Sequence, residues 1–163
     1  MYKIFVVRDR GLYKNITEEK KLRELNRQAN SLAKIGSWVF DVAANNIYWS
    51  DMVHQLHGTN SKTFVPDLET SLSFYREDFR EIVQENVSAC ISKGTPFDFE
   101  AVIVTAKKNE LWVKVIGSAE MINGKCVRVF GSFQDIHQRK EAENRLQSLA
   151  DNLPGVVFRY LIK

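Results

Sequence analysis

Two histidines are the first residues of this chain whose type and spacing could do chemistry. His54 and His57 stand three residues apart in a segment that we predict to be a short helix, so their side chains share a face. Imidazoles on one helix face can bind a metal such as zinc, but such a site needs a third and a fourth ligand. The sequence offers none beside them. We therefore predict no metal site and expect both histidines to be half-buried or on the surface.

Two cysteines are the next candidates for chemistry. Cys90 lies in an apolar stretch of a predicted helix, and Cys126 lies in an apolar predicted strand. Cysteines in such surroundings, without clustered histidines or aspartates, are typical of free thiols in a reducing compartment. We expect both to be buried free thiols.

The sequence carries no motif of a catalytic site. It has no Ser/His/Asp order, no paired-carboxylate motif and no glycine-rich phosphate loop. We therefore predict no catalytic residues and expect that the chain is not an enzyme. Any catalysis would belong to an output domain outside this sequence.

Composition places the chain among soluble globular proteins. Its 163 residues, 44% hydrophobic and 26% charged, allow one domain of ordinary size with attachments. The net charge of +3 is small and acidic residues are interleaved with basic ones, so we expect neither nucleic acid nor a membrane surface as a partner. Trp38, Trp49 and Trp112 are then expected to pack in the domain rather than to stack on bases.

The expected location follows from what the sequence does not contain. No apolar run approaches the length of a transmembrane helix, and no signal peptide follows Met1. We expect a cytoplasmic location with no membrane contact by these residues. The parent protein could still be anchored to a membrane elsewhere.

Three β-rich runs follow one another between residues 97 and 136. Phe97–Thr105, Leu111–Met121 and Val127–Asp135 alternate apolar residues with others, as strands with one buried face do. Asn123-Gly124 suits a tight hairpin, because both residue types tolerate positive φ. We predict an antiparallel meander, although the alternation by itself fits any three-stranded sheet.

The residues before this meander are predicted to form two strands and three helices. In chain order these are residues 36–42 and 47–49 as strands, 51–56 and 67–75 as short helices, and Glu77–Lys93 as one long helix. Gly94 suits the end of the long helix. We expect this helix to cover the sheet, with Val87 in contact with Ala101–Ile103 in a central region of the sheet.

An internal repeat indicates how the chain is divided. Residues between Val7 and Lys20 match residues between Val127 and Lys140 at a constant interval, and Leu153–Phe158 is similar to Ile35–Phe40. A repeat of this size is a domain rather than a solenoid unit, so we interpret the sequence as a fragment of a longer protein. The expected parts are the tail of a preceding repeat at 1–16, a linker helix at 17–34, a complete domain at 35–137, a C-terminal linker helix at 138–152 and the start of a following repeat at 153–163.

Both predicted strand-to-helix junctions have the spacing of a capping box. Asn15 stands three residues before Glu18, and Asp135 three residues before Gln138, so each pair could bond reciprocally at a helix start. Such a cap would join strand and helix into one stiff unit. For the first helix, Thr17 is an equally suitable cap, and the choice stays open.

The helices that follow these junctions have apolar residues at heptad-like spacing, over about two heptads each. The pattern fits either pairing with a helix of a second copy or packing on the domain's own sheet. The residues are Leu22, Leu25, Ala29 and Leu32 in the first helix and Ala142, Leu146, Leu149 and Leu153 in the second.

Five segments, in order, resemble those of PAS domains. They are Ile35–Asp41 with Tyr48–Asp51 and Gly58, Phe74–Asp78 in place of an "hPdD" segment whose Pro is replaced, Gly94–Phe97 with Glu100 for "G-x-P-F…E", Leu111–Val113 for "W-V", and Gly131–Ile136 for "G…D-I-T-E-R-K". The resemblance covers about Leu32 to Lys140. His137 stands where the family usually has Thr, and we expect this difference to weaken the local cap and little else.

The resemblance implies an α+β PAS fold. In this fold a five-stranded antiparallel sheet, with helices on one face, encloses a small apolar cavity and is flanked by N- and C-terminal linker helices. It also implies a sensory module of a bacterial signalling protein, such as a two-component histidine kinase or a diguanylate cyclase. The expected partners are a second copy, through the helical linkers, and the neighbouring PAS and output domains of the same chain.

Two functions remain open under this resemblance. One is a relay module that passes a conformational signal through its terminal helices and mediates dimerisation. The alternative is a ligand-sensing module that binds a small, largely apolar metabolite in the cavity. The relay is favoured, because the candidate cavity residues are bulky and offer no anchor for a charged ligand. The candidate cavity residues are Phe40, His54, Leu56, His57, Ile82, Val83, Phe99, Val113 and Phe133, and the candidate relay-junction residues are Asp135, Ile136 and Gln138.

No cofactor is predicted. The flavin-binding LOV type of PAS domain has an Asn-Cys-Arg-Phe segment, whereas Cys90 stands in Val-Ser-Ala-Cys-Ile. Haem-binding PAS domains usually carry an axial histidine on the long helix, and Glu77–Lys93 contains none. Flavin and haem are therefore both disfavoured.

Overall fold

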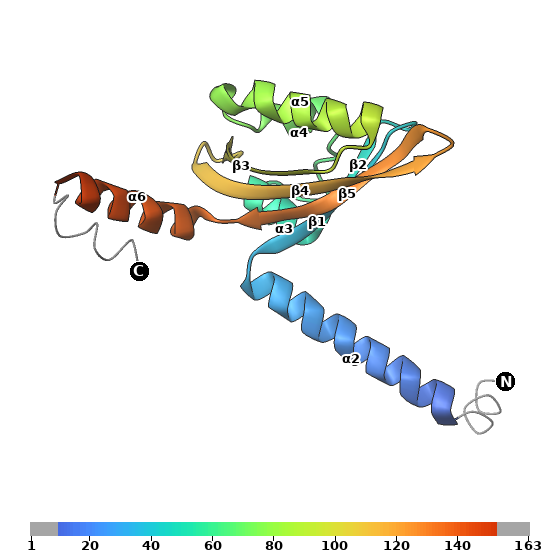
Figure 1. Cartoon of the computed structure of the whole chain (residues 1–163). Coiled ribbons are helices and arrows are strands. Elements are labelled where there is room, and N and C mark those ends of the chain that lie inside the picture. The colour runs from blue at the N-terminus through green and yellow to red at the C-terminus, as the bar shows by residue number, and fades with distance from the viewer. Residues whose placement is uncertain (1–9, 153–163) are drawn as a thin grey trace.

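A computed structural model describes residues 10–152, which form five helices and five strands (Figure 1). In chain order the elements are α2 (Arg10–Leu32), β1 (Ile35–Asp41), β2 (Asn46–Trp49), α3 (Asp51–His57), α4 (Leu68–Ser73), α5 (Glu77–Lys93), β3 (Phe97–Val104), β4 (Glu110–Ile122), β5 (Lys125–Asp135) and α6 (His137–Asn152). The long helix has the predicted bounds, and Gly94 ends it with a φ of 71°. The predicted beginnings and ends of neighbouring repeats at residues 1–9 and 153–163 lie outside the described residues.

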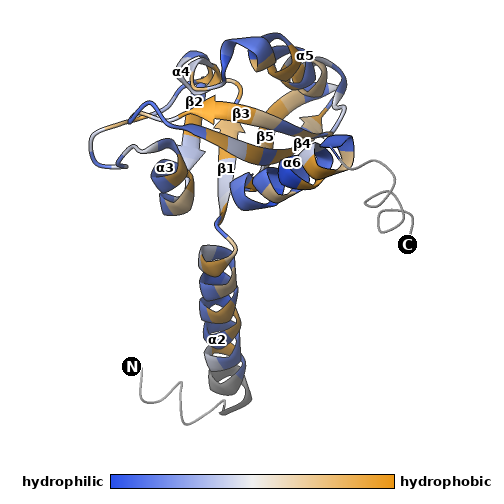
Figure 2. Cartoon of the chain, turned by 90° about the vertical axis from the view of Figure 1, so that its left-hand side faces the viewer, coloured by the Kyte–Doolittle hydropathy of each residue, from blue (hydrophilic) through white to orange (hydrophobic). Residues whose placement is uncertain are grey.

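The five strands form one antiparallel sheet in the order β2-β1-β5-β4-β3, which confirms the predicted meander and the α+β class. The hairpin between β4 and β5 contains Asn123 and Gly124, with φ values of 52° and 77°. The helices α3, α4 and α5 contribute to one core cluster with the sheet. In Figure 2 the strands show apolar colours mixed with intermediate and polar ones, and α5 and α6 each carry both apolar and polar stripes.

The strand β3 is an edge strand, so the prediction that Ala101–Ile103 lies in a central region of the sheet is wrong. The last strand, β5, returns between β1 and β4 and takes the central place. Residues 101–103 are nevertheless buried, because the chain before α5 covers this edge. The Arg76 N–H donates to the Val102 carbonyl over 2.8 Å, and the Val104 N–H donates to the Phe74 carbonyl over 2.7 Å. These bonds occupy groups that an open edge would expose to other chains.

The helix α2 begins at Arg10, so the prediction of a strand ending near Asn15 is wrong, and neither Asn15 nor Thr17 is the first helical residue. A strand needs a neighbouring strand for its backbone N–H and C=O groups, and among the described residues none lies beside this segment. A helix satisfies these groups internally. Figures 1 and 2 both show α2 projecting away from the sheet as a single rod. None of the helices in the described part of the chain combines the length and the apolar character needed to cross a bilayer.

Candidate functional site

A cavity of about 70 Å³ lies between the sheet and the helices α4 and α5. All five strands contribute to its wall, and the lining is mostly aromatic and aliphatic. Aromatic rings of this wall pack against one another, as Phe97 and Phe99 do with their centroids 5.5 Å apart. No charged side chain of the described residues lines the cavity, so a charged ligand would lose its hydration without compensation.

The structure brings some of the predicted cavity residues together and separates others. Ile82 is 52% exposed, so its assignment to the cavity is wrong. Successive helical residues are rotated by about 100°, and on α5 the cavity side belongs to Val83 and Val87, which are four apart. Phe40, His57, Val83, Phe99 and Phe133 line the cavity, whereas His54, Leu56 and Val113 are buried outside its lining.

Several residues that line the cavity are not among those predicted from the sequence. Trp38 shares a strand face with Phe40, and Trp49 shares one with Ile47, so alternation could have found both tryptophans. Ser71 and Tyr75 belong to α4 and the turn after it. No periodic signal in the sequence identifies residues in such short elements.

His57 is buried, with 2% of its surface exposed, so the expectation of a surface or half-buried histidine is wrong. Its Nδ1 lies 2.8 Å from the Val53 carbonyl oxygen, which can only accept, so Nδ1 carries the hydrogen. The ring stacks on Trp49 with centroids 4.1 Å apart. Burial lowers the pKa of His57 to about 4, and the ring is therefore neutral at pH 7.

His54 is also buried, contrary to the same expectation. Its Nδ1 lies 2.8 Å from the Thr59 hydroxyl, and its ring packs on the Trp49 ring in an edge-to-face arrangement, with the ring centroids 5.3 Å apart. Burial lowers the pKa of His54. Both histidines therefore serve as aromatic packing residues with one satisfied nitrogen. Within the described residues, no group of three or more potential ligands could hold a metal ion.

Two further polar groups line the cavity. The Ser71 hydroxyl is buried and has no hydrogen-bond partner. Tyr75 is 7% exposed, and burial raises the pKa of its hydroxyl. Together with His57, these residues place a few polar groups in an otherwise apolar cavity wall. Small-molecule binding sites usually have this composition.

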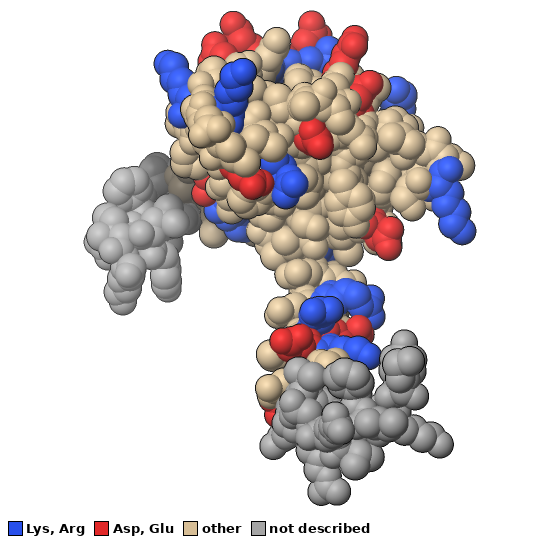
Figure 3. All heavy atoms as spheres, turned by 90° about the vertical axis from the view of Figure 1, so that its right-hand side faces the viewer, with Lys and Arg blue, Asp and Glu red and all other residues tan. Residues whose placement is uncertain are grey.

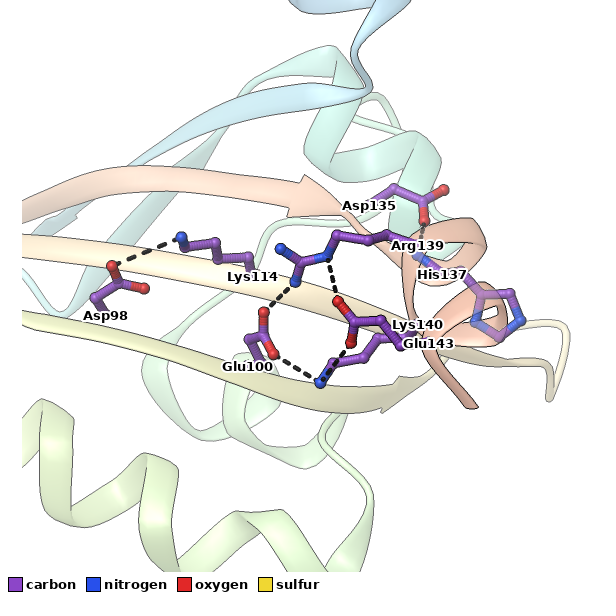
Figure 4. Close-up of polar contacts among 8 residues, drawn as sticks. All are labelled: Asp98, Glu100, Lys114, Asp135, His137, Arg139, Lys140 and Glu143. Carbon is purple, nitrogen blue, oxygen red and sulfur yellow. Dashed lines mark hydrogen bonds and ion pairs between the residues drawn. The ribbon is translucent and has the colours of Figure 1, made fainter. Parts of the chain in front are cut away.

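A second candidate site is the joint where β5 passes into α6. Asp135 Oδ1 accepts a hydrogen bond from the His137 N–H over 2.9 Å (Figure 4), and Asp135 Oδ2 lies 3.7 Å from Lys34 Nζ. The Asp135 N–H also donates to the Lys34 carbonyl over 3.1 Å. Asp135 thus bonds both to the start of α6 and to the residue between α2 and β1. We call these contacts, together with the hydrogen bonds of the Trp112 backbone to Ile136 and His137, the joint.

The predicted capping box is only partly present at this joint. The Asp135 side chain does accept a backbone N–H at the helix start, but the donor is His137, two residues later in the chain, and not Gln138, three residues later. Among the described contacts, Gln138 makes no reciprocal bond to it. The bond spans an Asx-type turn, because α6 starts at His137 and leaves Ile136 between cap and helix.

Trp112 on β4 completes the joint. Its carbonyl accepts from the Ile136 N–H over 3.0 Å, and its own N–H donates to His137 Nδ1 over 3.2 Å. Ile136 is 6% exposed. The expectation that His137 affects little beyond the cap is therefore wrong, because its ring attaches α6 to β4.

Ion pairs extend the contact between α6 and the sheet (Figure 4). Glu100 on β3 pairs with Arg139 and, over 2.8 Å, with Lys140 Nζ. Both cations also approach Glu143, at 3.6 Å. The hydrogen bond from Lys140 holds the pKa of Glu100 below its ordinary value, and the same bond raises the pKa of Lys140. Lys140 Nζ also lies 4.9 Å from the centre of the Trp112 ring.

The linker helices expose their apolar residues in the single chain. Leu22 and Leu25 on α2 are 60% and 61% exposed, and Leu146 and Leu149 on α6 are both 49% exposed. Of the two alternatives for the heptad-like pattern, packing on the domain's own sheet is therefore not what the structure has. Acidic and basic side chains are interspersed on the face of the molecule in Figure 3, including on α2.

Comparisons with known proteins agree with this geometry. A family model described as the PAS fold matches residues 46–133, more than half of the chain. Among solved structures, a sensory box histidine kinase/response regulator from Burkholderia thailandensis E264 is 23% identical over 80% of this chain and 98% of its own, with a TM-score of 0.67. No curated protein matches the sequence.

Two further solved structures are similar. The N-terminal domain of a diguanylate cyclase with a PAS/PAC sensor, from Marinobacter aquaeolei, is 12% identical over 65% of this chain and 98% of its own, with a TM-score of 0.60. A PAS domain of a protein from Colwellia psychrerythraea is 13% identical over 72% of this chain and 98% of its own, with a TM-score of 0.55. At these identities the similarity shows a shared fold.

Proposed function

This chain belongs to the PAS-fold family, and from that premise we propose that it is a sensory module that relays a conformational signal through its terminal helices. The observation that carries the proposal is the joint, where Asp135 and Trp112 bond the start of α6 to β4 and to Lys34, the residue directly before β1. The output would belong to another domain of a bacterial signalling protein, such as a histidine kinase or a diguanylate cyclase. The chain itself would not be an enzyme.

The joint supports a relay because it leaves little freedom between the sheet and α6. A flexible linker would let the helix keep its orientation when the sheet changes shape. Here three backbone or side-chain hydrogen bonds and the pairs of Glu100 hold the first turn of α6 against two strands. A change of sheet curvature would therefore move the start of α6 with it.

We propose further that α2 and α6 pair with the same helices of a second copy. The support is that their leucines at heptad-like spacing are largely exposed in the single chain. Pairing would bury these apolar side chains, as in a short coiled coil. Neighbouring PAS and output domains of the same chain would then receive the signal through paired helices.

Ligand sensing is the second candidate function. It is favoured by one observation, the buried Ser71 hydroxyl without a partner at the wall of the cavity. The cavity of about 70 Å³ is roughly half the size of an engineered apolar cavity, about 150 Å³, that holds benzene. The ligand would then be small, neutral and largely apolar, and we propose that neither flavin nor haem is bound. Native mass spectrometry of the purified chain would detect a co-purified ligand as added mass.

The relay is tested in the full-length parent protein with the variant Asp135→Ala. Output activity is measured with and without stimulus, and we expect the variant to be folded while its output no longer responds. Asp151→Ala is the matched control, because it removes the same side chain from the far end of α6, where Asp151 contacts only Gln147 among the described hydrogen bonds. A folded Asp135→Ala protein that responds normally would reduce the joint to an ordinary helix cap.

A further inference from the structure

His137 binds to the sheet through one ring nitrogen and faces a carboxylate with the other. The Trp112 N–H donates to Nδ1 over 3.2 Å, and Nε2 lies 3.4 Å from Glu141 Oε1. A backbone N–H can only donate, so Nδ1 is an unprotonated acceptor in this arrangement. The hydrogen of the neutral ring is then on Nε2, on the side of the Glu141 carboxylate. In this tautomer the hydrogen bond of the ring to the sheet is the one that Nδ1 accepts from Trp112.

A second proton on the ring would remove the bond to the sheet. It would bind at Nδ1 and turn this acceptor into a donor. Two N–H groups would then face each other across 3.2 Å, which neither can satisfy. The side chain is 34% exposed, so the ring can turn toward water. Histidine is the side chain whose charge ordinarily changes near neutral pH.

The charged groups around the ring come from four elements. On α6, the Glu141 carboxylate faces Nε2, and Lys140 lies over the Trp112 ring. At the end of β5, the Asp135 carboxylate accepts from the backbone of His137 rather than from its ring. On β3, Glu100 pairs with Lys140 and offsets its charge. On β4, Glu110 lies two residues before Trp112 and pairs with Arg76, and Lys114 lies two residues after it and pairs with Asp98.

We propose that protonation of His137 breaks the hydrogen bond between its ring and the Trp112 N–H on β4 and so makes the joint sensitive to pH. The Ile136 N–H bond to the Trp112 carbonyl and the Asp135 bond to the helix start do not depend on this ring. Acid would therefore loosen the joint without detaching the helix. The inference rests on the proposed function only in treating the joint as the route of the signal.

The test is nitrogen-15 NMR and amide hydrogen exchange of the full chain between pH 8 and pH 5.5. At pH 8 we expect the ring nitrogens of His137 to report the tautomer with hydrogen on Nε2. As the pH falls, the Trp112 amide signal should shift along the same titration curve as the His137 ring. The protection of that amide, corrected for the intrinsic exchange rate at each pH, should fall about two- to tenfold, as expected for one lost hydrogen bond.

Two variants separate titration from structure. His137→Asn supplies a side-chain oxygen that can accept from the Trp112 N–H and does not titrate, so protection of the Trp112 amide should be independent of pH. His137→Ala has no acceptor, so the amide should be poorly protected at every pH. The other histidines of the chain, His54 and His57, lie on α3 and are present in both variants, which controls for their titration.

Three results would overturn the inference. They are unchanged protection of the Trp112 amide in the wild type across this pH range, an equal loss of protection in His137→Asn, and a ring at pH 8 with its hydrogen on Nδ1. The relay assay with Asp135→Ala is made at a single pH and reads output, so it can succeed when this local test fails, and the reverse also holds.

Discussion

Replacing Asp135 by alanine measures how firmly the joint is held in solution. The substitution removes the carboxylate that accepts from the His137 N–H over 2.9 Å and leaves this N–H at the helix start without its partner. Loss of a side-chain acceptor at a helix start costs about 0.5–2 kcal/mol. The Lys34 pair adds little, because the Lys34 side chain is 59% exposed and exposed pairs contribute about 0–1 kcal/mol. The cap therefore dominates, and the expected total is about 0.5–2 kcal/mol.

Thermal and urea unfolding of the 163-residue chain are suitable assays. In a protein of this size, about 1 kcal/mol lowers the melting temperature by about 2–4 °C, so we expect a decrease of about 1–8 °C. The dependence of the unfolding free energy on urea should stay unchanged, because the variant exposes no further core surface on unfolding. Asp151→Ala, on the same helix, should unfold like the wild type.

The variant Asp135→Asn distinguishes the hydrogen bond from the charge. Its amide oxygen can still accept from the His137 N–H, while the negative charge near Lys34 is lost. We expect Asp135→Asn to lie closer to the wild type than to Asp135→Ala. An unchanged melting temperature of Asp135→Ala would show that the bond contributes nothing in solution, and equal losses in both variants would assign the effect to the charge.

Three other outcomes follow from the cavity and its wall. Val87→Asp should place an unpaired charge on the partly buried side of α5 beside the cavity and cost about 1–3 kcal/mol in urea unfolding, whereas Ile82→Asp on the exposed side of α5 should change little; equal effects would contradict the way α5 covers the sheet. The pKa of His57 is about 4 in the folded chain against an ordinary 6.5, so the unfolded chain takes up the proton first as the pH falls. Stability should therefore be complete above about pH 6.5 and should decrease by about 3 kcal/mol toward pH 4, a dependence that His57→Phe should reduce in urea unfolding at pH 7 and pH 5; a wild type without this dependence would place the ring in water. The purified protein should be colourless, and a visible absorption band of flavin or haem at stoichiometric occupancy would contradict the interpretation of the cavity.

Local signals in the sequence determined the helices and turns that depend on neighbouring residues only. Gly58 and Gly94 end α3 and α5 with positive φ, and Asn123 with Gly124 forms the hairpin as predicted. Positive φ is a property of single residues, so a few types in the right place identify it. Alternation in the strands likewise needs no distant partner, and it determined which strand face meets the core.

Only the tertiary structure decided the contacts between distant parts of the chain. Alternation along a strand carries no information about its neighbouring strands, so it could not show that β3 is an edge strand. The sequence predicts a half-buried or exposed His57 because no further metal ligand accompanies it, but the Val53 carbonyl and the Trp49 ring supply the partners that make burial possible. His137 and Trp112 are 25 residues apart, and their bond exists because β5 returns beside β4. A polar side chain is buried or exposed according to the partners that folding brings to it, and no spacing in the sequence records them.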